Sequence, residues 1–187
     1  MTETKSYETI AANVAAVREN MRQAALQAGR DPEEITLVAA TKVQTSQTIR
    51  NAIQAGITVC GENRVQELVA HLEDDAYAGA RVHFIGHLQT NKVKFVVGKV
   101  DMIESIDSQR LMDAVEKQAA KVGVVQDILL EVNIGQEESK GGAKREEIPP
   151  CGPVPPPAPA GAHVHPPRHR HRGRKSGVFP RNLSAFC

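Results

Sequence analysis

The stretch ITLVAAT, residues 35–41, is a short and almost continuous run of apolar side chains that leads directly into Lys42. A run of this length and character is typical of a strand that is buried on both faces of a parallel sheet. Upstream of it, apolar side chains recur at helical spacing over residues 6–28, and Gly29 stands where that helix should stop. A helix, a turn and a buried strand in this order predict the first unit of an α/β fold.

The alternation of strand and helix continues down the chain. Further strands are expected at residues 57–60, 82–85, 100–104 and 127–133. Between them the sequence predicts a helix capped by Ser46 and ended by Gly56, helices over residues 64–72 and 91–97, and a helix between Ser108 and Gly123. Such a pattern forms a parallel sheet, either open and doubly wound or closed into a (β/α)8 barrel. A complete barrel has about 250 residues and eight strands, whereas this sequence predicts five strands.

The composition changes abruptly after Ile148. All 22 acidic residues precede residue 149, while the segment 149–187 holds ten of the 11 prolines and six basic residues. Such a density of proline is incompatible with continuous helix or interior strand, and few apolar side chains are present to offset the entropy of ordering. We therefore expect residues 1–148 to be part of a barrel and residues 149–187 to be a disordered tail. The change is typical of a GC-rich coding region read in a shifted frame, and a frameshift is expected there.

The remaining composition argues against several classes of protein. The net charge is +1, and no stretch approaches the roughly 20 apolar residues of a membrane span. The N-terminus lacks the apolar core of a signal peptide, and the three cysteines have neither disulfide nor zinc spacing. The basic run 168–175 is not accompanied by an aromatic or folded platform for nucleic acid. We expect a cytoplasmic protein that binds neither membrane nor nucleic acid.

Polar side chains follow each predicted strand, and in a parallel α/β fold such residues gather at one edge. They are Thr41 and Lys42, residues 61–64, residues 86–89, residues 105–107, and Asn133. Lys42 is the most informative, because a desolvated lysine has a lowered pKa and its neutral amine can attack an aldehyde to form a Schiff base. The alternative is that Lys42 is a surface lysine at the start of a loop.

Five strings of this sequence resemble, in order and at similar spacing, the YggS/PROSC family of pyridoxal phosphate homeostasis proteins. They are LVAATK (37–42), GENRVQE (61–67), HFIGHLQTNK (83–92), SIDS (105–108) and EVNIGQEESKGG (131–142), and the resemblance runs from about Ile10 to Ile148. It implies a barrel like that of alanine racemase, without the extra β domain of that enzyme. It also implies that Lys42 holds pyridoxal 5′-phosphate (PLP) as a Schiff base, with Asn63 on the rim beside the cofactor.

The same resemblance implies a monomeric carrier in vitamin B6 homeostasis, which catalyses no committed reaction and whose recipients are PLP-dependent apoenzymes. In the family, a serine- and glycine-rich segment and a later Arg-x-Gly segment form the phosphate-binding pattern, and this sequence has neither. Two alternatives remain open: a racemase-like enzyme and a non-functional product. A racemase needs a second acid–base group, for which the chain offers only Tyr7 in the first helix and Tyr77 in a predicted surface loop.

Other polar residues have simpler interpretations. Glu62 and Glu67 flank a helix start and are predicted to serve capping and solubility as readily as chemistry. His83 is predicted to be packed or on the rim rather than to bind metal, and no required role is expected for His87. Lys140 lies in a string that resembles the family, but an exposed loop explains it equally well.

Overall fold

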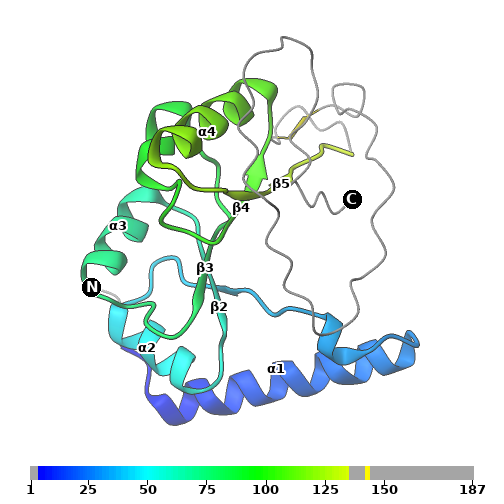
Figure 1. Ribbon diagram of the computed structural model, residues 1–187. Helices are drawn as coiled ribbons and strands as arrows, with labels where there is room; N and C mark the ends of the chain where they lie inside the picture. Colours follow the sequence, from blue (N-terminus) through cyan, green and yellow to red (C-terminus); the bar gives the residue numbers. More distant parts are fainter. Residues whose placement is uncertain (1–3, 135–141, 144–187) are drawn as a thin grey trace.

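A computed structural model describes residues 4–134 and 142–143 of the chain (Figure 1). Its strands are β1 (Ala39–Ala40), β2 (Val59–Glu62), β3 (Arg81–Phe84), β4 (Met102–Ile106) and β5 (Asp127–Leu130). Its α-helices are α1 (Tyr7–Gln27), α2 (Ser46–Gln54), α3 (Val65–Glu73) and α4 (Gln109–Val122), and two 3-10 helices are η1 (Pro32–Glu34) and η2 (Thr90–Phe95). The chain thus alternates strand and helix as the sequence predicts.

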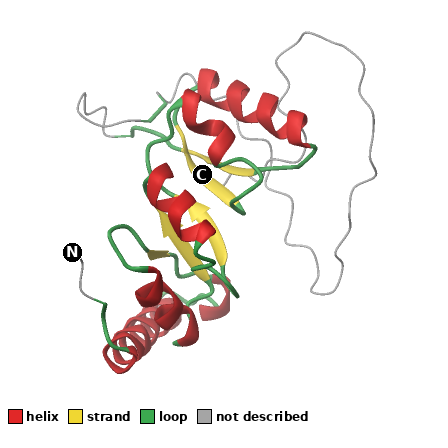
Figure 2. Cartoon of the chain, turned by 90° about the vertical axis from the view of Figure 1, so that its left-hand side faces the viewer, coloured by secondary structure: helices red, strands yellow, loops and turns green. Residues whose placement is uncertain are grey.

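The five strands form one parallel sheet in the order β1-β2-β3-β4-β5. A doubly wound sheet reverses its strand order at a switch point, whereas here each strand lies beside the next one in the sequence. Helices α2, α3 and α4 lie on one side of the sheet in both views (Figures 1 and 2). Sequential order with helices on one face is the arrangement of a barrel wall. The described residues therefore form five strands of a (β/α) barrel, which decides between the two sheets that the sequence left open.

Local signals explain where the helices begin and end. The Ser108 side chain accepts a hydrogen bond from the Leu111 N–H at the start of α4, and Gly123, with φ +74°, ends that helix in the left-handed conformation. For α2 the expected cap is wrong by one residue, because Thr45 rather than Ser46 accepts from the Thr48 N–H. The predicted helix at residues 91–97 is the 3-10 helix η2.

The strand bounds differ more from expectation. The strand predicted at residues 35–41 shortens to β1, and most of its side chains are half-buried or exposed rather than buried. The reason is that β1 pairs with β2 alone among the described residues, so one edge of it lacks a neighbour there. The strand predicted at residues 57–60 lies two residues later, as β2, because its pairing with β3 runs from Val59 to Glu62.

The core fills the space between the sheet and the helices. Its largest fully buried side chains include Phe84 of β3, Ile103 of β4, Leu68 of α3 and Leu111 of α4. Burial of each such side chain contributes about 1.5–3 kcal/mol. This packing holds the carboxyl ends of the strands, where the polar residues gather, in a fixed arrangement.

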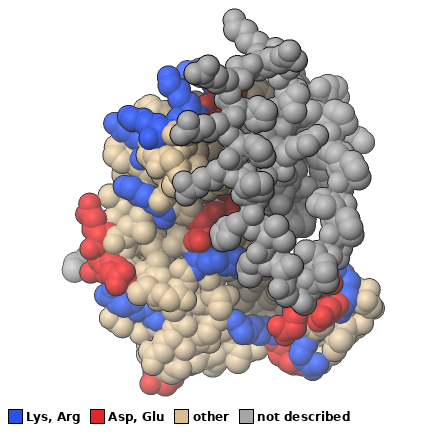
Figure 3. Space-filling model, in the orientation of Figure 1, with Lys and Arg blue, Asp and Glu red and all other residues tan. Residues whose placement is uncertain are grey.

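Some expectations concern residues that the structure does not describe. The boundary near residue 148 and the tail 149–187, expected to be disordered, lie outside the described residues. Within the described part, no helix is long and apolar enough to cross a membrane. Acidic and basic side chains are interspersed on the face in Figure 3, so the described residues of that face produce no single-sign field.

Candidate functional site

The carboxyl ends of β1 and β2 place two of the sequence-predicted residues at one level. Ala40 of β1 is in register with Gly61 of β2, and Lys42 and Asn63 each follow this pair by two residues. The Thr41 N–H extends the ladder by donating to the Gly61 carbonyl at 2.8 Å. The structure therefore brings Lys42 and Asn63 to neighbouring positions on the rim.

Lys42 is exposed and occupies a tight turn. Its ammonium group has neither an ion-pair nor a hydrogen-bond partner among residues 4–134 and 142–143. The sequence predicts a desolvated Lys42, but the described residues do not enclose its side chain. At Lys42 the strand has ended and the chain turns. Among the described residues, the Lys42 amine is therefore exposed and makes no contact that holds the fold.

Asn63 is half-buried and carries an unsatisfied polar atom. Its Oδ1 is shielded from solvent and has no hydrogen-bond partner in the described part of the chain. Buried polar atoms almost always have a partner, so an orphaned one at a rim marks a place where a ligand donor fits. Gly86, after β3, lies directly against the Asn63 backbone, where an added Cβ would be 2.0 Å from the Asn63 carbonyl oxygen.

Beneath this rim lies a buried polar cluster centred on Glu62. The Glu62 side chain is fully buried and accepts hydrogen bonds from the Thr41 hydroxyl (3.0 Å), the Tyr77 hydroxyl (3.0 Å) and the Asn63 N–H (2.8 Å). His71 places its Nδ1 3.3 Å from the same carboxyl group. Of the alternatives left open for Glu62, a surface role in capping or solubility does not fit, because the side chain is fully buried and four polar groups enclose it.

Tyr77 corrects a second expectation. It was predicted in a surface loop, but it is 5% exposed, and its ring packs edge-on against His71. Burial is the main cause that raises the pKa of Tyr77 far above its ordinary value. Its hydroxyl therefore keeps its proton and donates to Glu62. The neighbouring Cys60 is a fully buried core residue, and its burial raises the pKa of the thiol to about 11.

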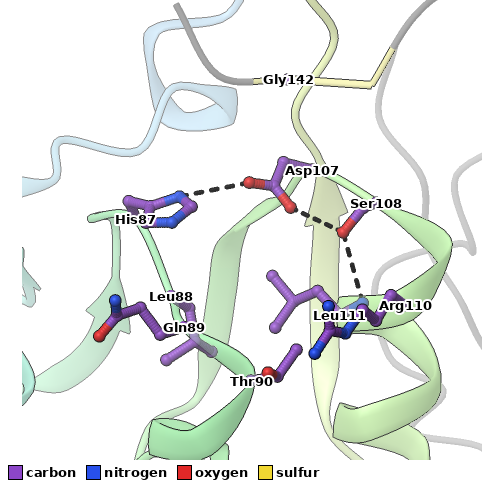
Figure 4. Close-up of a pocket in the computed structure, with 9 residues that line it drawn as sticks. All are labelled: His87, Leu88, Gln89, Thr90, Asp107, Ser108, Arg110, Leu111 and Gly142. Carbon is purple, nitrogen blue, oxygen red and sulfur yellow. Dashed lines mark hydrogen bonds and ion pairs between the residues drawn. The ribbon is translucent and has the colours of Figure 1, made fainter.

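A polar cavity of about 470 Å³ opens at the carboxyl ends of β3 and β4 (Figure 4). His87 Nδ1 lies 3.2 Å from the Asp107 carboxylate, whose other oxygen accepts from the Ser108 hydroxyl at 3.0 Å. These residues belong to the strings 83–92 and 105–108. Among the described residues, no group of three or more His, Cys, Asp or Glu could hold a metal. His83 is packed, 2.6 Å from the Glu104 carboxylate, as predicted.

No family model matches the chain. It is 43% identical over 132 residues to the pyridoxal phosphate homeostasis protein of Aquifex aeolicus, and 37% identical over 142 residues to that of Escherichia coli K12. These alignments cover 71% and 74% of this chain. The chain is a relative of the pyridoxal phosphate homeostasis proteins. It spans about three-fifths of their length, 58% and 61% in these two cases.

Solved structures agree with this relationship. The crystal structure of an unknown protein from Bifidobacterium adolescentis matches with a TM-score of 0.70 and 36% identity, over 77% of this chain and 62% of its own. PipY of Synechococcus elongatus, solved with PLP bound, matches with a TM-score of 0.61 and 29% identity, over 74% and 59%. Alanine racemase of Bartonella henselae, at 13% identity and a TM-score of 0.53 over 76% and 37%, supports the fold alone.

The sequence analysis did not identify one residue of the buried polar cluster, His71, although it lies four residues after Glu67 and therefore on the same face of α3. Lys140 lies outside the described residues, while Gly142 lines the polar cavity.

Proposed function

We propose that this protein binds PLP and acts in its intracellular homeostasis, with Lys42 as the point of covalent attachment and Asn63 as a rim contact. The observation that carries the proposal is that Lys42, whose amine has no partner among the described residues, and Asn63, whose Oδ1 is unsatisfied there, follow the same register pair of β1 and β2. The names of the curated relatives and the PLP-bound PipY structure support the choice of cofactor.

The residues present fit the chemistry that PLP supplies, which is an aldehyde on an aromatic ring. The Lys42 amine would hold the cofactor by condensing with this aldehyde, with loss of one water and no oxidant or reductant needed. No described residue donates to the Asn63 Oδ1, so this oxygen could accept a hydrogen bond from a donor on the ligand. Because Lys42 is exposed, a cofactor attached there stays within reach of a recipient molecule.

Mapping of the covalent attachment tests this proposal. The 187-residue chain is incubated with PLP, reduced with borohydride and digested, and the pyridoxyl label is located by mass spectrometry. We expect the label on Lys42 in preference to the other exposed lysines, of which Lys94 and Lys99 serve as internal references. A label spread evenly over the lysines would show that Lys42 has no special role.

The physiological setting forms part of the same proposal. We place the protein in the cytoplasm, as a monomer that hands PLP to PLP-dependent apoenzymes. The accessibility of Lys42 supports transfer to another protein rather than storage in a closed site.

One of the two tyrosines that could serve as the second acid–base group of a racemase does not fit that role. Tyr77 is buried and its hydroxyl donates to Glu62, so it is not available as a base on the rim. We therefore expect PLP-saturated protein to show no racemase or transaminase turnover with common amino acids above the background of free PLP. Chiral chromatography of alanine and glutamate after long incubation measures this. Robust turnover that disappears in Lys42→Ala would favour the enzyme instead.

A further inference from the structure

We propose that Glu67 and His71 of α3 are positioning residues that hold the turn carrying Lys42, an inference that rests on the proposed function. The two side chains lie one helical turn apart on the same face of α3. Glu67 Oε2 accepts a hydrogen bond from the Val43 N–H at 2.7 Å, and His71 Nε2 lies 3.2 Å from the Gln44 carbonyl oxygen. Two backbone groups of the turn, the Val43 N–H and the Gln44 carbonyl, thus both contact side chains of one helix.

The turn is one that needs to be held. Val43 has φ +54°, a left-handed conformation that is unfavourable for an L residue and most of all for a β-branched one. The Val43 side chain is 56% exposed, so little apolar burial compensates for the strain. Within the turn, the Gln44 N–H donates to the Thr41 carbonyl at 3.1 Å. The contacts from α3 are the further interactions that fix this backbone. Strain that persists beside a reactive group is characteristic of functional sites.

Both positioning side chains are themselves fixed. The second oxygen of Glu67 pairs with the Arg64 guanidinium at 3.3 Å, and a carboxylate makes a stronger hydrogen bond to an N–H than a neutral acceptor does. His71 must carry a hydrogen on Nε2, because a carbonyl oxygen only accepts. Its Nδ1 side faces the Tyr77 hydroxyl at 3.1 Å and the Glu62 carboxyl group at 3.3 Å. A continuous set of contacts therefore joins the buried Glu62 to the turn beside Lys42.

A fixed turn narrows the positions that the Lys42 amine can occupy. Holding a reactive group in place accelerates its reaction by removing unproductive arrangements. Loss of the contacts should therefore slow the capture of PLP and make it less selective for Lys42, without removing the chemistry of the amine. When the contacts from α3 are lost, replacement of Val43 by glycine should restore the rate of PLP capture. Glycine adopts positive φ without steric cost, so the turn then keeps its conformation without those contacts.

Five variants of the 187-residue chain test the proposal, and the fifth is His71→Phe. Glu67→Ala removes the acceptor for the Val43 N–H, and Glu67→Gln retains an acceptor oxygen. Val43→Gly combined with Glu67→Ala relieves the strain, and Glu73→Ala is the matched control, since Glu73 is an exposed glutamate of the same helix. Two quantities are measured: the rate constant for appearance of the visible absorption band with PLP, and the amide exchange rate of Val43 without PLP.

We expect Glu67→Ala to slow capture by about tenfold, the effect of losing one hydrogen bond, and to speed exchange at the Val43 amide. Glu67→Gln and the double variant should recover most of the capture rate, while Glu73→Ala should match the parent. His71→Phe, which removes the donor to Gln44 but keeps an aromatic ring beside Tyr77, should slow capture in the same direction. Thermal melts confirm that each variant is folded.

Two results would overturn the inference. One is parental Val43 exchange in Glu67→Ala, which would mean that the contact does not hold the turn. Another is faster Val43 exchange with parental capture at Lys42, which would mean that the turn does not position the amine. If the parent itself captures no PLP, the proposed function fails, and Val43 exchange alone still decides whether Glu67 holds the turn.

Discussion

Replacing Lys42 with alanine is expected to abolish covalent capture of PLP while changing the free energy of unfolding by no more than about 0.5 kcal/mol. The first effect follows because the proposed attachment needs a primary amine at this position. The second follows because the Lys42 side chain is exposed and has no partner among the described residues. A residue that the fold does not need but that PLP capture requires has a chemical role and not a structural one.

Two comparison variants sharpen this experiment. Lys42→Arg keeps the positive charge but cannot supply a neutral amine, so it should fail as completely as alanine. Lys99→Ala removes another exposed lysine, in the turn before β4, and should capture PLP normally. Visible absorption with PLP and urea unfolding without it measure the two effects. Undiminished capture by Lys42→Ala would refute the assignment, and a large loss of stability would give Lys42 a structural role instead.

The elements that were predicted well are those determined by local signals. Helix α4 begins at the Ser108 cap and ends at Gly123, both of which can be recognised from neighbouring residues alone. Strand limits depend instead on hydrogen bonds to other strands. The apolar run 35–41 gives no indication that only Ala39 and Ala40 pair with β2. The choice between an open sheet and a barrel likewise required the order of the strands.

The residues of the site also differ in whether local sequence or long-range packing determines their positions. Lys42 and Asn63 could be found because residues that follow parallel strands share one edge of the sheet. The environment of Glu62 could not be predicted, because its hydrogen-bond donors Thr41 and Tyr77 are distant in sequence and meet only in the fold. Without that cluster, Glu62 resembled a surface acid and Tyr77 a loop residue. The role of His71 depended on the same long-range packing.

Gly86 gives the other large expected effect. A Cβ built at this position would lie 2.0 Å from the Asn63 carbonyl oxygen, 2.6 Å from its carbonyl carbon and 2.7 Å from its Cα. All three are backbone atoms, which cannot rotate away as the end of a side chain can. On the other side, the Gly86 carbonyl accepts from the buried Ser105 hydroxyl at 2.5 Å, so the strand end cannot retreat without losing this bond. Gly86 is therefore confined between β2 and β4.

We expect Gly86→Ala to reduce the free energy of unfolding by about 3 kcal/mol, the upper end of the usual cost of overpacking. It should also weaken PLP binding, because the clash displaces the backbone of Asn63. Gly61→Ala is the matched comparison in β2: the three atoms nearest to its Cβ would be the side-chain atoms Ile85 Cδ1 at 2.8 Å, Val38 Cγ1 at 2.9 Å and Ile85 Cγ1 at 3.4 Å. Those side chains can shift, so the loss of stability should be smaller. Urea unfolding and PLP titration of both variants test the contrast, which a Gly86→Ala protein of parental stability would contradict.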